Sequence, residues 1–281
     1  MPTESDTPAP RNELAASCHG VVKIYYTLAG EVAALKGVDL EFPAAAVSAV
    51  VGPSGSGKSS LLRIIGGLDR PTAGRVRLGA AETSGLRARQ LRKLRRRMVG
   101  YVFQRPADNL VPYLSVVDHL KQAARIRSRA KGWQSEAEEI LHALGLSERA
   151  THLPAQLSGG EQQRLAFAAA AMGSPVLVIA DEPTGELDSE STSGLLRSVA
   201  SLTRRQTAFV IATHDPAIVR AAGRTYHLRH GSVEAESREN RSLSVIDADG
   251  RIQLPAGWND LFPSGRAQIV VEDHSMRIIP P

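Results

Sequence analysis

The chain has 281 residues, of which 42% are hydrophobic and 22% charged, with one cysteine and a formal net charge of +5. This length allows one large domain with an appendage. A single cysteine excludes an intramolecular disulfide and fits a reducing compartment. No apolar run approaches the ~18 residues of a membrane-spanning helix, so if the protein serves a membrane process, we expect another chain to cross the bilayer.

The N-terminal part predicts a lead-in followed by strands. Residues 1–11 are rich in proline, serine, threonine and aspartate without an apolar core, so we expect a disordered segment over 1–20 and no signal peptide. Residues 31–36 and 38–42 alternate like two strands of an antiparallel subdomain. Residues 74–78 predict one more strand after a turn that ends in glycine.

A glycine-rich loop follows the apolar run 47–51. This P-loop and the first turn after it consist of Gly52, Pro53, Ser54, Gly55, Ser56, Gly57, Lys58, Ser59 and Ser60. Glycines let backbone N–H groups surround phosphate oxygens, and the following helix adds its positive N-terminus. Lys58 would reach the β- and γ-phosphates of ATP, and the Ser59 hydroxyl would bind Mg²⁺. By itself this motif fits any P-loop NTPase.

Basic residues are concentrated in the next predicted helix. The segment contains Arg87, Arg89, Arg92, Lys93, Arg95, Arg96 and Arg97, with Leu86, Leu91, Leu94 and Met98 spaced along it. This spacing predicts an amphipathic helix with an apolar stripe and a basic face. A solvated face is the first interpretation, since charge runs are commonly that. Contact with anionic lipid headgroups is the alternative.

Residues 105–156 look helical, clearly so over 135–144, where a serine cap and early acids open a helix that Gly145 ends. A second glycine motif then opens a helix to Met172, with Ser158, Gly159, Gly160 and Glu161 at its start. Next comes the apolar strand 176–180, followed by two acids. Adjacent buried carboxylates need a partner. Asp181 would hold Mg²⁺, and Glu182 would polarise the water that attacks the γ-phosphate.

These motifs, in this order, resemble those of the ATP-binding-cassette ATPases over residues 21–231. The resemblance implies an α/β fold, with a P-loop core sheet, an antiparallel β subdomain and a helical subdomain over about 105–165. It assigns Gln104 to the Q-loop, as a catalytic and Mg²⁺-binding residue beside Ser59 and Asp181. It also assigns His214 to the H-loop and Asp188 to the D-loop. Tyr25 would stack on adenine, with Tyr26 as the alternative.

The same resemblance implies how the protein works. Ser158–Glu161 would complete the nucleotide site of a second copy in a head-to-tail homodimer, which closes on ATP and opens after hydrolysis. The run 66–74, the basic helix before the Q-loop and the run 181–188 look most like the ATPases of macrolide exporters, lipoprotein-release complexes and the cell-division ATPase FtsE. That subgroup implies a separate integral-membrane permease, a peripheral position on the cytoplasmic face of the cell membrane, and no nucleic acid. The run 167–172 departs from the family by lacking the arginine often found after the signature motif.

Two alternatives concern the function and the C-terminus. A soluble cassette ATPase of DNA repair or translation would usually have a second cassette or a long insertion. Residues 232–242 read as a polar linker, and 243–281 as a small β-rich domain with hairpins over 245–255 and 267–280. This order is similar to the AbrB-like swapped-hairpin fold, through Gly250, Arg251, Pro255 and Gly265. An unrelated β appendage is the alternative.

Overall fold

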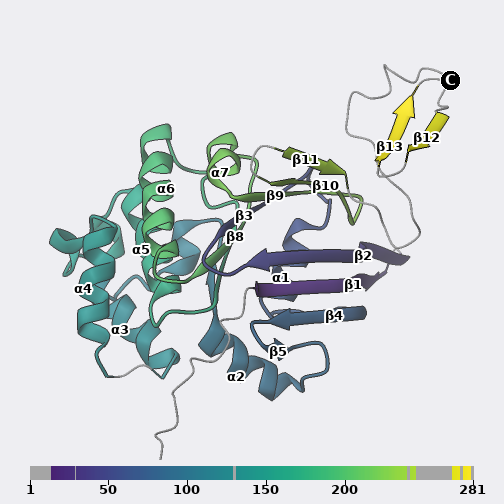
Figure 1. The fold of residues 1–281 in the computed structure, drawn as a ribbon. Coiled ribbons are helices and arrows are strands. Elements are labelled where there is room, and N and C mark those ends of the chain that lie inside the picture. Colours follow the sequence, from purple (N-terminus) through teal and green to yellow (C-terminus); the bar gives the residue numbers. More distant parts are fainter. Residues whose placement is uncertain are drawn as a thin grey trace, which may run out of the picture.

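The computed structural model describes residues 14–28, 30–128, 131–238, 241–244, 268–272 and 275–279. Figure 1 shows helices α3 to α6 on one side of a central sheet and an antiparallel sheet on the other. Within these described ranges, every helix falls short of the length or apolarity that crossing a bilayer demands.

The antiparallel sheet has the order β2-β1-β4-β5. Its strands are β1 (Leu14–Thr27), β2 (Gly30–Pro43), β4 (Ala73–Leu78) and β5 (Ala81–Glu82). The expected disordered lead-in is therefore wrong from residue 14 onward. Ala15, Ala16 and Cys18 are fully buried there, because small apolar side chains fit where the sheet packs on the core. The two strands expected over 31–42 are one continuous β2.

The central sheet has the order β11-β10-β9-β3-β8-β7-β6. Its parallel part consists of β3 (Val47–Val51), β6 (Val99–Val102), β7 (Leu177–Asp181), β8 (Ala208–Ala212) and β9 (Arg224–Arg229). Two antiparallel strands extend it, β10 (Ser232–Arg238) and β11 (Arg241–Ser244).

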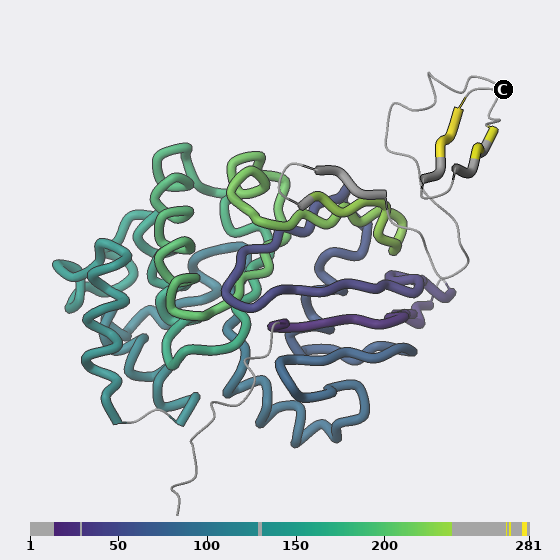
Figure 2. Tube along the Cα trace, viewed as in Figure 1, coloured from purple at the N-terminus to yellow at the C-terminus, as the bar shows by residue number. Residues whose placement is uncertain are grey.

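The linker expected over 232–242 is therefore wrong. β10 pairs with β9 along its length, and Val233 packs against the core. The strand reads as polar because only one of its faces meets apolar neighbours, which is common in antiparallel sheets. β10 also lies beside β2, as the tube in Figure 2 shows, so the segment joins the two sheets.

Helix α1 (Lys58–Ile65) lies between the two sheets and contacts β1, β4, β7 and β8. Leu61, Leu62, Ile64 and Ile65 are buried in this layer. Because the helix begins directly at Lys58, the packing of its apolar side chains fixes where the P-loop sits.

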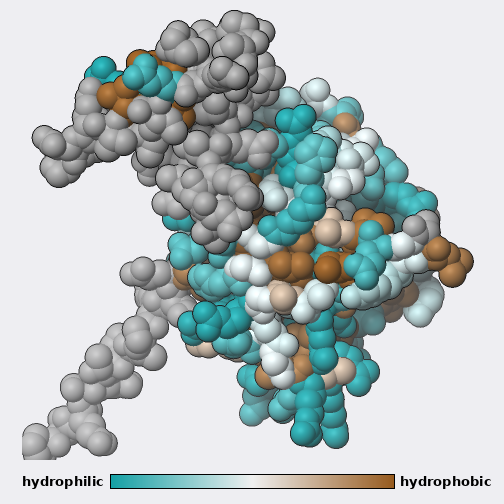
Figure 3. Space-filling view, turned by 90° about the vertical axis from the view of Figure 1, so that its right-hand side faces the viewer, coloured by the Kyte–Doolittle hydropathy of each residue, from teal (hydrophilic) through white to brown (hydrophobic). Residues whose placement is uncertain are grey.

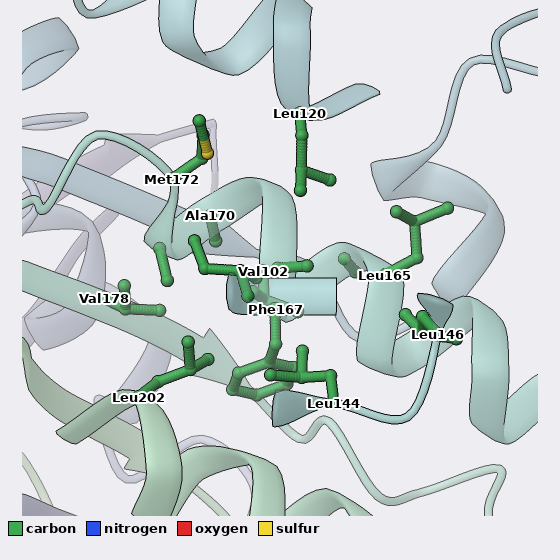
Figure 4. Close-up of a cluster of buried hydrophobic side chains, with 14 of the residues drawn as sticks. Val102, Leu120, Leu144, Leu146, Leu165, Phe167, Ala170, Met172, Val178 and Leu202 are labelled. Carbon is green, nitrogen blue, oxygen red and sulfur yellow. The ribbon is translucent and has the colours of Figure 1, made fainter. Parts of the chain in front are cut away.

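The helical layer covers the other face of the central sheet. It comprises η1 (Pro106–Asn109), α3 (Val116–Ile126), α4 (Trp133–Ala143), η2 (Ser147–Arg149), η3 (Pro154–Gln156), α5 (Gly159–Ala171), α6 (Ser189–Thr203) and α7 (Pro216–Ala221). Figure 4 shows Phe167 of α5 among the side chains of this core, which includes Leu120, Leu144 and Leu202. Helix α2 (Ala88–Met98) lies apart from this layer, near the antiparallel sheet in Figure 1.

Two C-terminal strands form a separate two-stranded sheet, β12 (Gln268–Glu272) and β13 (Ser275–Ile279). They pair antiparallel, from Gln268 opposite Ile279 to Glu272 opposite Ser275, as the sequence predicted for the second hairpin. The first expected hairpin, over 245–255, and Gly265 lie outside the described residues. The AbrB-like resemblance therefore stays a prediction.

Candidate nucleotide site

Four neighbouring parallel strands end at one edge of the central sheet. In space their order is β3, β8, β7 and β6, and they lead into the P-loop, His214, the Asp181–Glu182 pair and Gln104. Open α/β sheets bind ligands at the carboxyl ends of their strands. The sheet therefore brings together four motifs that are far apart in the chain.

The P-loop needs its glycines because other backbone lies against it. Gly52 has a φ of 152°, and a Cβ there would lie 2.0 Å from the carbonyl oxygen of Leu228. Gly57 has a φ of 104°, and a Cβ there would lie 2.4 Å from the carbonyl oxygen of Ala34. Neither backbone oxygen can move aside as a flexible side chain would. The loop is thus held from both sheets.

The loop has unused polar groups that suit a phosphate. The first turn of α1 leaves backbone N–H groups without intrahelical partners, and the Ser59 hydroxyl is exposed there. Ser56 Oγ is buried without a hydrogen-bond partner in the described structure. Lys58 Nζ donates to the carbonyl oxygens of Gly52 (2.7 Å) and Pro53 (3.2 Å). The Lys58 ammonium is therefore held within the glycine-rich loop, which the sequence predicts to bind phosphate.

Glu182, His214 and Lys58 form one cluster. Glu182 Oε1 lies 3.1 Å from His214 Nε2, and Oε2 accepts a hydrogen bond of 3.2 Å from the His214 backbone N–H. His214 Nε2 is 3.4 Å from Lys58 Nζ. Glu182 has a left-handed φ of 46°, which costs about 1–3 kcal/mol in a residue other than glycine. Its N–H donates to Ala212 O at 2.9 Å, which helps to hold this conformation.

The residues expected to hold Mg²⁺ supply oxygen donors. Asp181 ends β7, and Ser59 lies in the first turn of α1, which contacts β7. The Gln104 side-chain amide nitrogen lies 3.6 Å from the point where a Cβ on Gly185 would be, in the loop after Glu182. Among the described residues, no three His, Cys, Asp or Glu side chains gather as a metal cage. Because Mg²⁺ usually keeps waters and phosphate oxygens and takes one or two carboxylates, this sparse oxygen set fits it.

Tyr25 lies beside the P-loop helix. Its hydroxyl is 3.4 Å from Ser60 Oγ and donates to Asp69 Oδ2 at 3.1 Å. Lys23 Nζ lies 4.7 Å from the ring centroid and donates to Asp69 Oδ1 at 2.9 Å. Burial raises the pKa of Asp69, but hydrogen bonds from Lys23, the Arg70 backbone and Tyr25 outweigh it and lower that pKa.

These contacts place Tyr25 next to the P-loop helix, with the Lys23 ammonium near its ring. Tyr26 is 75% exposed. The supporting roles of Lys23 and Asp69 were missed from the sequence, because 46 residues separate them and no local pattern connects them.

The second glycine motif forms the first turn of α5. Ser158 caps the helix by accepting a hydrogen bond from the Glu161 N–H (3.2 Å), and Glu161 accepts one from the Ser158 N–H (2.8 Å). Arg149 pairs with the same Glu161 carboxylate at 3.0 Å. This capping box fixes the turn and leaves Ser158 and Gly159 exposed.

The D-loop lies beside this turn. A Cβ on Gly160 would lie 2.7 Å from Ser191 Oγ in α6, so glycine allows the two helix starts to approach. Asp188 caps α6 by accepting a 2.7 Å hydrogen bond from the Ser191 N–H, which lowers the pKa of Asp188. No hydrogen bond among the described residues joins the α5 turn to the P-loop of the same chain.

Comparison with known proteins decides the family. The family model described as ABC transporter matches residues 35–185. The chain belongs to this family. It is 39% identical over 219 residues to the lipoprotein-releasing system ATP-binding protein LolD 2 of Caulobacter vibrioides, covering 77% of this chain and 95% of that protein.

Two further matches bear on fold and organisation. The macrolide export ATP-binding/permease protein MacB of Marinobacter nauticus is 40% identical over 235 residues, which cover 82% of this chain but 36% of MacB. An ATP-binding cassette solved as a post-hydrolysis dimer with ADP and Pi is 34% identical, with a TM-score of 0.71, covering 81% of this chain and all of that one.

The predicted membership of the ABC family, the α/β cassette fold and the ATPase activity are thereby confirmed. The chain is an ABC-type ATPase subunit, and the same family and matches show its site to be one for ATP. The alternative of a nucleic-acid-directed ATPase finds no support in these relatives.

Proposed function

We propose that this ABC ATPase subunit works as a homodimer on the cytoplasmic face of the cell membrane, where it drives a separate integral-membrane permease. The observation that carries the catalytic part is the cluster of Glu182, His214 and Lys58 beside the P-loop, at the ends of adjacent strands. The imidazole of His214 lies within hydrogen-bond reach of both the Glu182 carboxylate (3.1 Å) and the Lys58 ammonium (3.4 Å).

Each side chain then has one task. Lys58 exchanges its contacts with the P-loop carbonyls for the β- and γ-phosphate oxygens of ATP. Glu182 accepts a proton from the attacking water. His214, in contact with both, positions the Glu182 carboxylate and reaches the γ-phosphate side of the site.

Mg²⁺ would be held by Ser59, Asp181 and Gln104, and when bound it neutralises charge on the transferred phosphoryl group. Gln104 follows β6 and so connects this site to the helical layer. Tyr25 binds adenine by stacking, which is worth ~1–3 kcal/mol for a base on an aromatic ring.

The α5 turn completes the site of the other subunit. Ser158 and Gly160 lie at a helix N-terminus, whose N–H groups and positive end suit an anion. The exposed position of Ser158 and Gly159 leaves them accessible to a second chain. The γ-phosphate would then bridge two subunits, and its release after hydrolysis would remove that bridge.

Two relatives support the separate permease. MacB, named as an ATP-binding/permease protein, is matched over 36% of its length, whereas LolD 2, named as an ATP-binding protein, is matched over 95%. The residues that match are those shared with an ATP-binding protein, and this supports a permease on another chain as the membrane-spanning part.

Mixed dimers test the shared site. Ser158→Arg chains lose the α5 turn's contact and Lys58→Ala chains lose the phosphate cation, so each protein alone should be inactive. In a heterodimer one composite site carries both defects and the other carries neither, so mixing should restore ATPase activity. Heterodimers that form without regaining any activity would contradict shared sites.

A second experiment tests the partner. The tagged wild-type protein, purified from detergent-solubilised membranes, should retain a multi-span membrane protein. Recovery with ribosomes or DNA instead would contradict the transport function.

A further inference from the structure

The outer face of α2 carries an isolated positive charge. We call this the basic face; it consists of Arg89, Arg92, Lys93, Arg95, Arg96 and Arg97. The whole chain has 34 lysines and arginines and 29 acids. Without these six, 28 cations stand against 29 acids, so the basic face alone accounts for the net positive charge. The net positive charge of the protein is therefore concentrated on the basic face of α2.

The opposite side of α2 fixes how the basic face points. Leu91 is buried and would lie 3.1 Å from a Cβ on Gly67, and Leu94 and Met98 pack on the core. Because the apolar stripe is anchored, the cations cannot turn inward. Figure 3 shows hydrophilic side chains projecting from the lower end of the molecule, the end at which Figure 1 places α2.

Within the described part of the chain, the basic face has no acidic partner. Some arginines elsewhere do pair with acids, such as Arg149 with Glu161 and Arg205 with Glu139. No ion pair of the described residues includes a member of the basic face. Like charges three and four residues apart on a helix destabilise it. An external anion would remove that repulsion.

A hollow of about 870 Å³ lies over these cations. Its lining consists of the basic face together with Ile126 and Ser128, and it contains no acid. Ile126 is 44% exposed. An apolar side chain among cations is the arrangement of surfaces that rest on a membrane, where cations meet headgroups and apolar groups reach the acyl boundary.

Two smaller hollows continue from the first one. One of about 670 Å³ shares Lys93 and Arg97, and the other, of about 320 Å³, shares Arg95 and Arg96. Both reach Arg127, which is only 8% exposed and whose Nε has no partner among the described residues. The smaller one is also lined by Gly100 and Tyr101 of β6, the strand before Gln104. The basic region therefore borders the strand that leads to the nucleotide site.

We propose that the basic face binds the anionic phospholipid headgroups of the membrane in which the permease lies. This rests on the proposed function, which places the protein at that membrane. A duplex nucleic acid fits less well: α2 is only about 16 Å long, the rest of the chain has a net negative charge, and no aromatic side chain lines the 870 Å³ hollow to stack on a base.

Sedimentation with lipid vesicles tests this. The purified full chain should bind vesicles of phosphatidylcholine with phosphatidylserine, not phosphatidylcholine alone, and added salt should weaken binding. Replacing Arg92, Lys93 and Arg96 by glutamine should lower binding about 100-fold, since each cation near an anionic surface contributes about fivefold. Unchanged binding by this variant would overturn the proposal.

The matched control replaces by glutamine three exposed arginines that form no ion pair with another described residue: Arg75, Arg204 and Arg220. It changes the net charge equally, so an equal loss of binding would mean that only overall charge matters and would overturn the site. Displacement of vesicles by inorganic phosphate at matched ionic strength would indicate a small-anion site instead. Tighter binding of duplex DNA through the same three residues would indicate nucleic acid.

ATP hydrolysis without permease should be the same in wild type and both variants, because none of the six replaced residues belongs to the nucleotide site. An inactive wild type that still binds vesicles would refute the proposed ATPase role and leave the lipid site intact. A wild-type protein that hydrolyses ATP but does not bind anionic vesicles would refute the lipid site and leave the proposed ATPase role intact.

Discussion

Arg127 fixes the end of α5 against the edge of the central sheet. Its guanidinium donates to the carbonyl oxygens of Ala170 (2.7 Å) and Val99 (3.2 Å). Gly100 leaves room for this approach, since a Cβ there would lie 2.1 Å from Ala170 O. The run 165–172, which lacks the arginine common in the family, thus receives a guanidinium from the end of α3. We predict that removing it destabilises the protein.

The magnitude follows from two opposing contributions. Two hydrogen bonds from a charged donor are worth about 1.5–3 kcal/mol each. Against this, burial lowers the pKa of Arg127 from 12.5 to about 10, which corresponds to roughly 3 kcal/mol against the charged form. Arg127→Met keeps the packing volume, so it should cost about 0–3 kcal/mol. Arg127→Ala also leaves a cavity and should cost about 2–5 kcal/mol.

Urea unfolding of both variants measures these costs. Arg125→Met is the matched control: it lies two residues earlier, is exposed, and should change the free energy of unfolding by less than ~0.5 kcal/mol. Because α5 starts with the turn that contacts the partner's nucleotide, Arg127→Met should also lower ATPase activity in the folded protein. If Arg127→Ala were as stable as the Arg125 control, the bracing role would be refuted.

Three further predictions follow from burial and backbone geometry. Gly52→Ala should destabilise the protein far more than Gly55→Ala, because its Cβ would meet a β9 carbonyl oxygen at 2.0 Å, whereas a Cβ at Gly55 meets nothing within 4 Å; equal melting temperatures would contradict this. Burial raises the pKa of Cys18 to about 12, above about 8.5 in an unfolded chain. Stability should therefore fall as pH rises through that interval, by up to ~1.4 kcal/mol per pH unit; a Cys18→Ala variant with the same alkaline slope would exclude this source. Ending the chain after Gly231 should destabilise it, since β10 belongs to the sheet, while ending it after Ser244 should not; equal stability of the two would argue against β10.

The P-loop and the strands that lead to the candidate site could be predicted from the sequence because their motifs are local. A P-loop needs glycines at fixed spacing and an apolar strand before it, and Gly52 and Gly57 prove necessary through backbone contacts. The sequence also predicted the strand that ends at Asp181 and the strand that ends just before His214. That β8 lies between β3 and β7, which brings His214 between Lys58 and Glu182, depends on sheet order, which no local pattern encodes.

The two errors at the domain edges have a shared cause. Residues 14–20 and 232–238 lack long apolar side chains in regular alternation, so they read as lead-in and linker. In residues 14–20, small side chains such as that of Cys18 are buried in the antiparallel sheet. In residues 232–238, the side chain of Val233 packs against the core. Both strands owe their place to neighbours supplied by the rest of the fold.

The rate of ATP hydrolysis by the Glu182→Gln variant tests the catalytic role of the Glu182, His214 and Lys58 cluster most directly. Glutamine keeps the shape of the side chain and leaves Asp181 and Lys58 in place, but it cannot accept a proton from water. This variant should bind ATP with near-wild-type affinity and accumulate as an ATP-bound dimer. Its hydrolysis should fall about 100-fold or more. Hydrolysis at the wild-type rate would contradict the assignment of Glu182 and of the cluster around it.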